Sequence, residues 1–205
     1  MQQRAEKTRS AILSAARTLF AAGGFAATSV DSIAAKAKAN KQRIYAYFGS
    51  KRRLFEAVLL EVFSESAAEF AAFAASFRPG EQDLTFELSQ YYQKLHLEKP
   101  EFQRLLSWAN LEDAIDPVAL SQARKSENQA LKLWFDRERD AGRIRTDAEF
   151  ESWLLTVMGT AYFASSNALT LRETLGESFF QGEARRRRSR DLARLFRSGG
   201  GPDEC

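Results

Sequence analysis

The chain has 205 residues with a formal net charge of +3, and 44% of its residues are hydrophobic, which is enough to bury a small domain and a larger one. It contains no run of 18 or more apolar residues, and MQQRAEKTRS lacks the hydrophobic stretch of a signal peptide, so we expect no membrane segment and a cytoplasmic location. The single cysteine, Cys205, excludes an internal disulfide and a cysteine metal cluster.

The charge is unevenly distributed along the chain. Residues 1–60 contain 11 Lys+Arg against 3 Asp+Glu, whereas the remaining residues contain 19 against 24. A basic block of this kind is typical of a phosphate-binding surface, although most charge runs only keep a helix face solvated. The interpretation therefore depends on the motifs within the block.

Helices are predicted throughout, because β-branched residues are sparse and no alternating run is bounded by turns. The first is expected over residues 7–22, where apolar residues recur at helical spacing until Gly23-Gly24 stops it. A second, short helix should begin near Ser29. Thr28 and Asp31 form a capping-box-like start, in which the Thr28 hydroxyl can accept a backbone N–H.

A tight turn and a third helix should follow. Val30, Ile33, Ala34 and Ala37 give the second helix a face of mostly small apolar residues, which allows another helix to approach closely. The turn falls at Lys38-Ala39, and Asn40 is a good N-cap for a helix over residues 41–47.

The third helix carries the side chains that suggest a function. Ile44 and Phe48 are spaced to point inward, which leaves the polar and tyrosine side chains outward. Gln can bind adenine and Arg can bind guanine in a bidentate manner, while Lys, Tyr and a helix N-terminus bind phosphate. The sequence thus predicts a helix-turn-helix DNA-binding site with these candidate residues: Thr28, Ser29, Asn40, Lys41, Gln42, Arg43, Tyr45, Tyr47 and Lys51.

A fourth helix should start after Gly49, with Ser50 as its cap and three cations, Lys51 to Arg53, in its first turn. Cations are unfavourable at a helix N-terminus, which suggests compensation by an external anion. This helix should run over residues 51–77 until Pro79-Gly80. Turn signals then delimit helices over residues 84–97, 101–114, 117–141, 148–171 and 174–197, and residues 199–205 have the composition of a disordered tail.

These residues resemble the TetR family of transcriptional regulators. The similarity lies in Ile33-Ala34, Tyr45-Ala46-Tyr47-Phe48 and Ser50-Lys51, and it covers about residues 8–60. It implies an all-α protein with a three-helix DNA-binding domain at 1–55 and a helical ligand-sensing and dimerisation domain at 56–198. One departure is Lys38, where the family usually has glycine, which adopts the left-handed conformation more easily.

The resemblance also implies partners: a palindromic DNA operator, a second copy of the chain, and a small apolar or aromatic effector that relieves repression. No cofactor is expected, and activation instead of repression stays possible. Aromatic residues in helical bundles most often fill the core, but the family's pocket between the middle helices suggests some as ligand contacts. The candidates are Tyr91, Tyr92, Trp108, Asn110, Trp134 and Tyr162.

The dimer would use the last two long helices. An apolar stripe supports this, although the same stripe could equally be internal core. Its members are Trp153, Leu154, Val157, Met158, Ala161, Tyr162 and Ser165. The arginines between Arg185 and Arg197 most simply form a solvated face, with a nucleic-acid or partner contact as the alternative.

Two other classes of function compete with a sensing regulator. An enzyme is not expected, because one His and one Cys leave no nucleophile–base pair, and no phosphate loop or metal-spaced ligand set is present. His96 is expected to be structural, and Glu112-Asp113 would point apart on a helix. An architectural, ligand-independent DNA-binding protein is the second alternative, and it would show weak sequence preference.

Overall fold

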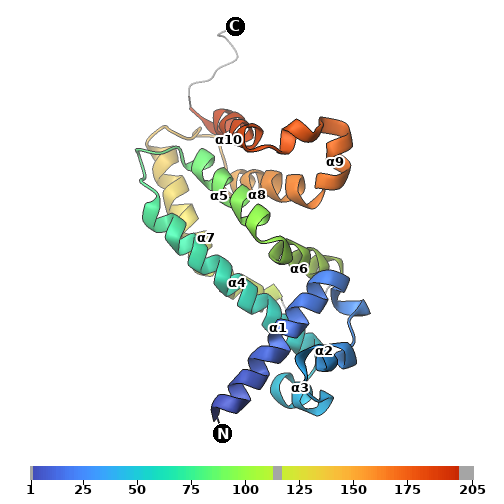
Figure 1. Cartoon of the computed structure of the whole chain (residues 1–205). Helices are drawn as coiled ribbons and strands as arrows, with labels where there is room; N and C mark the ends of the chain where they lie inside the picture. Colours follow the sequence, from blue (N-terminus) through green and yellow to red (C-terminus); the bar gives the residue numbers. More distant parts are fainter. Residues whose placement is uncertain (1, 113–116, 199–205) are drawn as a thin grey trace. The chain divides into compact units, whose positions relative to one another are not determined.

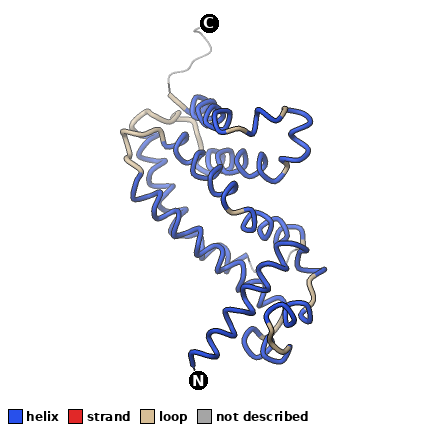
Figure 2. The backbone as a smooth tube through the Cα atoms, viewed as in Figure 1, coloured by secondary structure: helices blue, strands red, loops and turns tan. Residues whose placement is uncertain are grey.

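The computed structural model describes residues 2–112 and 117–198, which form an all-helical protein (Figure 1). Within these residues the backbone forms no strand (Figure 2), only two isolated bridges. The elements are α1 (Gln2–Ala27), α2 (Val30–Ala37), α3 (Lys41–Phe48), α4 (Lys51–Ser76), α5 (Leu84–Glu98), α6 (Pro100–Leu111), α7 (Pro117–Asp140), α8 (Phe150–Ser166), α9 (Ala168–Leu175), the 3-10 helix η1 (Glu177–Phe180) and α10 (Gly182–Phe196).

The helix boundaries predicted from sequence are close for α2 to α7 and differ at both ends of the chain. α1 continues past Gly23 to Ala27, but Gly24 kinks it with φ 79° and ψ 178°. Two helices are predicted over residues 148–171 and 174–197, but the structure has three α-helices there, α8, α9 and α10. Asn167 ends α8, and Gly176, with φ 79°, ends α9. Some predictions fall on residues that the structure does not describe. These are the end of a helix at Ala114, the residue Asp113, and the tail at residues 199–205 with Cys205.

The chain forms two compact units: unit 1 comprises residues 1–68 and 100–125, and unit 2 comprises residues 69–99 and 126–205. This division places α6 with the N-terminal helices, whereas the functional boundary predicted at residues 55/56 separates them. The assignment of sensing and dimerisation to residues 56–198 stays a prediction.

The core of unit 1 joins α1 to the two short helices and to the start of α4. Phe20 and Phe55 are fully buried and meet edge to face, with ring centroids 4.9 Å apart. Arg17 ties α1 to both α4 and α6, because its guanidinium lies 2.6 Å from Glu65 Oε1 and 2.9 Å from Glu101 Oε2. These contacts fix the base on which α2 and α3 rest.

The length and apolar composition of α1 would also allow it to cross a membrane. Its apolar stripe has another use, because Ile12, Ala16 and Phe20 are completely buried within unit 1. The composition of α1 is therefore explained by packing in the core.

The core of unit 2 contains α5 and α8. Trp153 is completely buried, and its indole Nε1–H donates to Thr85 Oγ1 at 3.0 Å. Val157 and Ala161 are buried on the same face of α8. The centre of the apolar stripe predicted for dimerisation is thus internal core, and the apolar side chains that α8 exposes are Leu155 and Phe163.

Candidate nucleic-acid interface

Ser29 caps α2, accepting a hydrogen bond from the Ser32 N–H to its Oγ at 3.0 Å. The cap predicted at Thr28 is wrong by one residue. The Thr28 hydroxyl donates instead to the Gly24 carbonyl at 2.7 Å, and the residue is buried. The kink at Gly24 exposes that carbonyl, so Thr28 secures the end of α1 and does not present its side chain at the surface.

The turn between α2 and α3 is closed by Lys38 in the left-handed conformation, with φ 51° and ψ 40°. The Lys38 N–H donates to the Ala35 carbonyl at 3.2 Å, which ends α2. Asn40 then caps α3, since its side chain accepts a hydrogen bond from the Arg43 N–H at 2.9 Å. Both the turn and the cap lie where the sequence predicts them.

α3 is amphipathic in the predicted sense. Ile44 and Phe48 are buried on its inner face. Lys41, Gln42 and Arg43 in its first turn are exposed, Tyr45 is 43% exposed and Tyr47 is half-buried. The first turn of α3 therefore presents donors and acceptors of the kind that contact base edges and phosphates.

The outward side chains of α3 differ in the hydrogen bonds and ion pairs that they form within the chain. The Lys41 ammonium lies 3.0 Å from the Asp31 carboxylate, and this hydrogen bond raises the pKa of Lys41. In the part of the chain that the structure describes, no hydrogen bond or ion pair holds the side chains of Gln42 and Arg43. Gln42 and Arg43 are thus available to an external partner.

The start of α4 is held by contacts within the chain. Ser50 caps it, accepting a hydrogen bond from the Arg53 N–H at 3.1 Å. The Lys51 ammonium donates to the Ala26 carbonyl at 3.2 Å and lies 4.4 Å from the centre of the Phe25 ring. An internal carbonyl and an aromatic face therefore already compensate this cation, for which the sequence suggested an external anion.

Three of the six predicted ligand contacts lie in or beside one aromatic cluster in unit 2. Tyr91 stacks on Phe73 with centroids 5.0 Å apart, and Trp134 lies 5.0 Å from Phe77. Tyr92 is buried beside Tyr91, and its hydroxyl donates to Glu127 Oε1 at 3.0 Å. Phe70 and Phe73 of this cluster are not among the predicted contacts, although their spacing along α4 places them on one face.

The remaining three predicted contacts lie elsewhere. Tyr162, on α8, meets His96 with ring centroids 5.6 Å apart. Trp108 and Asn110 belong to α6 in unit 1, where Trp108 packs against Gly24. Burial lowers the pKa of His96 to about 4, which agrees with a structural role.

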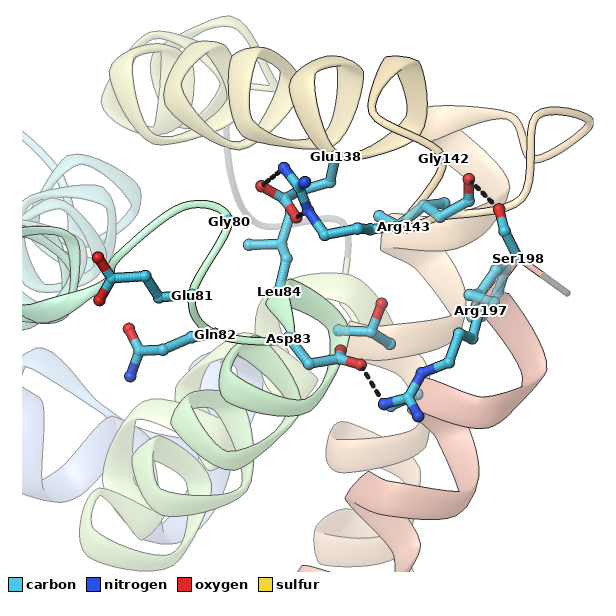
Figure 3. A pocket seen from close by; sticks show the side chains of 14 residues that line it. Gly80, Glu81, Gln82, Asp83, Leu84, Glu138, Gly142, Arg143, Arg197 and Ser198 are labelled. Atoms are coloured by element: carbon cyan, nitrogen blue, oxygen red, sulfur yellow. Dashed lines mark hydrogen bonds and ion pairs between the residues drawn. The ribbon is translucent and has the colours of Figure 1, made fainter.

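Two surface hollows are lined by described residues of unit 2. One, of about 490 Å³, has Phe73, Tyr91 and Leu95 among its lining residues. The other, of about 360 Å³, contains two ion pairs (Figure 3). In it the guanidinium of Arg143 binds the buried carboxylate of Glu138, and Arg197 lies 3.0 Å from Asp83. These arginines are committed to carboxylates, so this hollow is a structural junction.

The arginines of α10 are divided between internal contacts and a solvated face. Arg188 donates to the Phe179 carbonyl and lies 4.2 Å from the centre of its ring. Burial lowers its pKa. Arg194 pairs with Asp191 at 3.1 Å, whereas Arg186 and Arg190 are exposed. Among the described residues, no group of three or more His, Cys, Asp or Glu is arranged to hold a metal ion.

Comparison with known proteins agrees with this geometry. A family model described as bacterial regulatory proteins, tetR family, matches residues 12–58, which include α2, the turn and α3. A second model, described as tetracyclin repressor-like, C-terminal domain, matches residues 86–195, more than half of the chain. The chain belongs to the TetR family.

Individual relatives of this TetR protein are transcriptional repressors. It is 29% identical over 192 residues to the repressor NicS of Pseudomonas putida, covering 89% of this chain and 87% of that one. It is 34% identical to the repressor SCO4008 of Streptomyces coelicolor, covering 70% of each. This TetR protein is therefore a DNA-binding transcriptional regulator and not an enzyme.

Solved structures share the fold. A TetR family regulator from Marinobacter aquaeolei superposes with a TM-score of 0.74 at 23% identity, covering 97% of this chain and all of that one. The regulator SCO4942 from Streptomyces coelicolor gives a TM-score of 0.72 at 22% identity, covering 94% and 99%. The expected all-α fold, with a helix-turn-helix at its N-terminus, is confirmed.

Proposed function

We propose that this TetR regulator is a cytoplasmic repressor that binds a palindromic operator as a homodimer and is released by a small, largely apolar or aromatic ligand. The observation that carries the DNA-reading part is the exposed first turn of α3, in which Gln42 and Arg43 have no commitment within the described chain. The cap at Asn40 fixes the direction of this turn.

Base readout is assigned to Gln42 and Arg43. Gln42 would bind an adenine edge and Arg43 a guanine edge in the major groove, each contributing roughly 1–3 kcal/mol of discrimination. Lys41 would bind phosphate, since its ion pair with Asp31 is exposed and an exposed pair is easily exchanged. Tyr45 and Tyr47, at the far end of the same face, would orient the helix on the DNA backbone.

Exposed apolar side chains in unit 2 support the homodimer. Leu155 is 73% exposed and Phe163 is 57% exposed, and they lie two turns apart on one face of α8. Gly159 lies between them with no atom near its β-carbon position, so a second helix can approach closely there. A two-fold dimer would present its α3 helices to half-sites about 34–36 Å apart, which calls for a palindromic operator.

The aromatic cluster supports the ligand. The rings of Tyr91, Phe73 and Trp134 supply apolar surface, and Tyr91 and Trp134 also carry a polar group. Phe73 and Tyr91 border the hollow of about 490 Å³. Such lining suits a planar apolar or aromatic molecule. Ligand binding would change the population of two arrangements of the DNA-reading helices and thereby lower operator affinity.

The test of DNA reading is selection of bound duplexes from a random pool, followed by anisotropy titration of the enriched duplex and a mixed-sequence duplex. Arg43→Ala should weaken binding to the enriched duplex by about tenfold or more, and binding to the mixed duplex much less. Arg190→Ala removes the same charge from an exposed position of α10 and should leave both affinities unchanged. Failure to enrich any sequence would favour the architectural alternative.

The dimer and the ligand need separate measurements. Leu155→Glu should convert the dimer to a monomer in sedimentation experiments, because a buried unpaired carboxylate is strongly unfavourable. Glu151→Gln, on an exposed position of the same helix, is the matched control. The ligand is sought by screening phenols and aromatic acids for compounds that release the wild-type protein from its operator. Tyr91→Ala should abolish this ligand-induced release while leaving operator affinity unchanged.

A further inference from the structure

Lys38 has an unusual backbone conformation for its residue type. Within the described ranges it is the only residue other than glycine with a positive φ, at 51°. The other positive-φ positions are Gly24, Gly49, Gly80, Gly142 and Gly176.

The hydrogen bonds at the end of α2 require this conformation. The Lys38 N–H donates to the Ala35 carbonyl at 3.2 Å, and the Ala39 N–H donates to the Ala34 carbonyl at 3.0 Å. A β-carbon is disfavoured in the left-handed region, whereas glycine enters it without strain. Lys38 therefore carries backbone strain that glycine would relieve, and strain of this kind tends to occur at functional sites.

The charge of Lys38 is not engaged by any described residue of the chain. Its side chain is exposed, and no hydrogen bond or ion pair holds its ammonium group in the described part of the chain. The one acidic residue of α2, Asp31, is already bound by Lys41 at 3.0 Å. Neutralising a neighbouring carboxylate is therefore not the reason for a lysine at this turn.

The position of Lys38 relative to α3 suggests its partner. It precedes the Asn40 cap by two residues, and Gln42 and Arg43 lie in the first turn of the helix after that cap. When the first turn of a recognition helix reaches base edges, the segment just before it meets the sugar–phosphate strand that borders the groove. We propose that Lys38 binds a DNA backbone phosphate, so that a strained lysine replaces an unstrained glycine to strengthen DNA binding.

This inference rests on the proposed DNA reading by α3, and substitutions at Lys38 can separate charge from strain. Lys38→Gln removes the charge and keeps the β-carbon, Lys38→Arg keeps both, and Lys38→Gly removes both. Lys94→Gln, at an exposed position of α5 in unit 2, removes one charge elsewhere as the matched control. Each variant is titrated against two duplexes between about 50 and 200 mM salt. One duplex is the DNA upstream of the gene that encodes the protein, and the other has a mixed sequence.

A phosphate contact predicts a defined change in salt dependence. For Lys38→Gln the slope of log K against log salt should shrink by about 0.9 per bound subunit, and affinity at about 0.1 M salt should fall roughly eightfold per subunit. The loss should be equal on both duplexes, because phosphates carry no sequence. Lys38→Arg and Lys94→Gln should keep the wild-type slope.

Thermal melting completes the design. Lys38→Gly should bind DNA as weakly as Lys38→Gln but melt at a higher temperature, whereas Lys38→Gln should melt like the wild type. An unchanged slope in Lys38→Gln, with a wild type that binds, would overturn the phosphate contact. A loss confined to the upstream duplex would also overturn it, since this would indicate a base contact. Absence of binding by the wild type on both duplexes would overturn the DNA-reading function itself.

Discussion

Gly24→Ala should strongly destabilise this TetR protein, because the kink in α1 tolerates no β-carbon. Gly24 has φ 79° and ψ 178°, a region open almost only to glycine, and an L-residue there costs about 1–3 kcal/mol. A β-carbon would also lie 2.8 Å from the Trp108 ring and 2.7 Å from Glu112 Oε1. Overpacking of this kind adds about 1–3 kcal/mol.

The two effects together predict a loss of about 4 kcal/mol in the free energy of unfolding. For a chain of this length the melting temperature should fall by roughly 8–16 °C. The assay is thermal unfolding, followed by the circular dichroism signal of the helices at about 222 nm. Gel-shift titration beside it should show weaker DNA binding, because Thr28 and the start of α2 depend on the Gly24 carbonyl.

Gly23→Ala is the matched control for this prediction. Its β-carbon would meet Thr28 Oγ1 at 3.8 Å, an ordinary contact, within a helical segment. The substitution should stabilise the protein by about 0.5–1 kcal/mol. If Gly24→Ala melts together with Gly23→Ala, the reasoning about the kink is refuted. In a Trp108→Ala background Gly24→Ala should cost less than in the wild type, because the ring contact is already removed while the strain in φ remains.

Three further predictions concern single groups. Asn40→Ala should lower the free energy of unfolding by about 1 kcal/mol in urea titrations, because the Arg43 N–H loses its cap; Asn40→Asp should retain most of it. Tyr92→Phe should lower it by about 1–3 kcal/mol, since the hydroxyl bond to Glu127 is buried; equal stability would contradict this role. Burial holds the pKa of His96 near 4, below its ordinary 6.5, so the unfolded chain binds the proton first as pH falls. Stability should therefore decline by up to about 3 kcal/mol between pH 6.5 and 4, and His96→Gln should flatten that part of the urea-stability profile.

The helix-turn-helix could be predicted because its determinants are local. Asn40 and Ser50 cap the helices that follow them directly, and Gly49 ends the helix before it. The position of the turn at Lys38-Ala39 follows from its place between two short apolar stripes, whereas the left-handed conformation of Lys38 was not predicted. Each of these features depends on residues within four positions of one another, so a single sequence contains the information.

The corrections at Thr28 and Lys51 depend on the path of the backbone at the kink in α1. Thr28 and Ser29 are equivalent as caps in sequence, and only the carbonyl exposed by the kink at Gly24 distinguishes them. The partners of Lys51 lie about 25 positions earlier in the chain, on and beside the same kinked segment.

The candidate pocket and the dimer face could be predicted only in part, because a local pattern does not show which residues the fold brings together. Nothing in the local pattern separates Trp108 from Trp134, although the fold assigns them to different units. α8 is apolar around much of its circumference, since Trp153 is buried and Leu155 is exposed. Periodicity alone therefore cannot choose which face is internal.

Both backbone groups of Ala26 are hydrogen-bonded to side chains of other helices or of the residue that follows one. The Ala26 N–H donates to Glu112 Oε2 at 2.7 Å, and the Ala26 carbonyl accepts from the Lys51 ammonium at 3.2 Å. The last turn of α1, which leads into α2, is thus attached to Glu112 directly after α6 and to Lys51 at the start of α4. Substitutions at Glu112 or Lys51 would therefore change how firmly α2 and α3 are held without changing Gln42 and Arg43. The affinity for DNA and the preferred DNA sequence can then evolve independently.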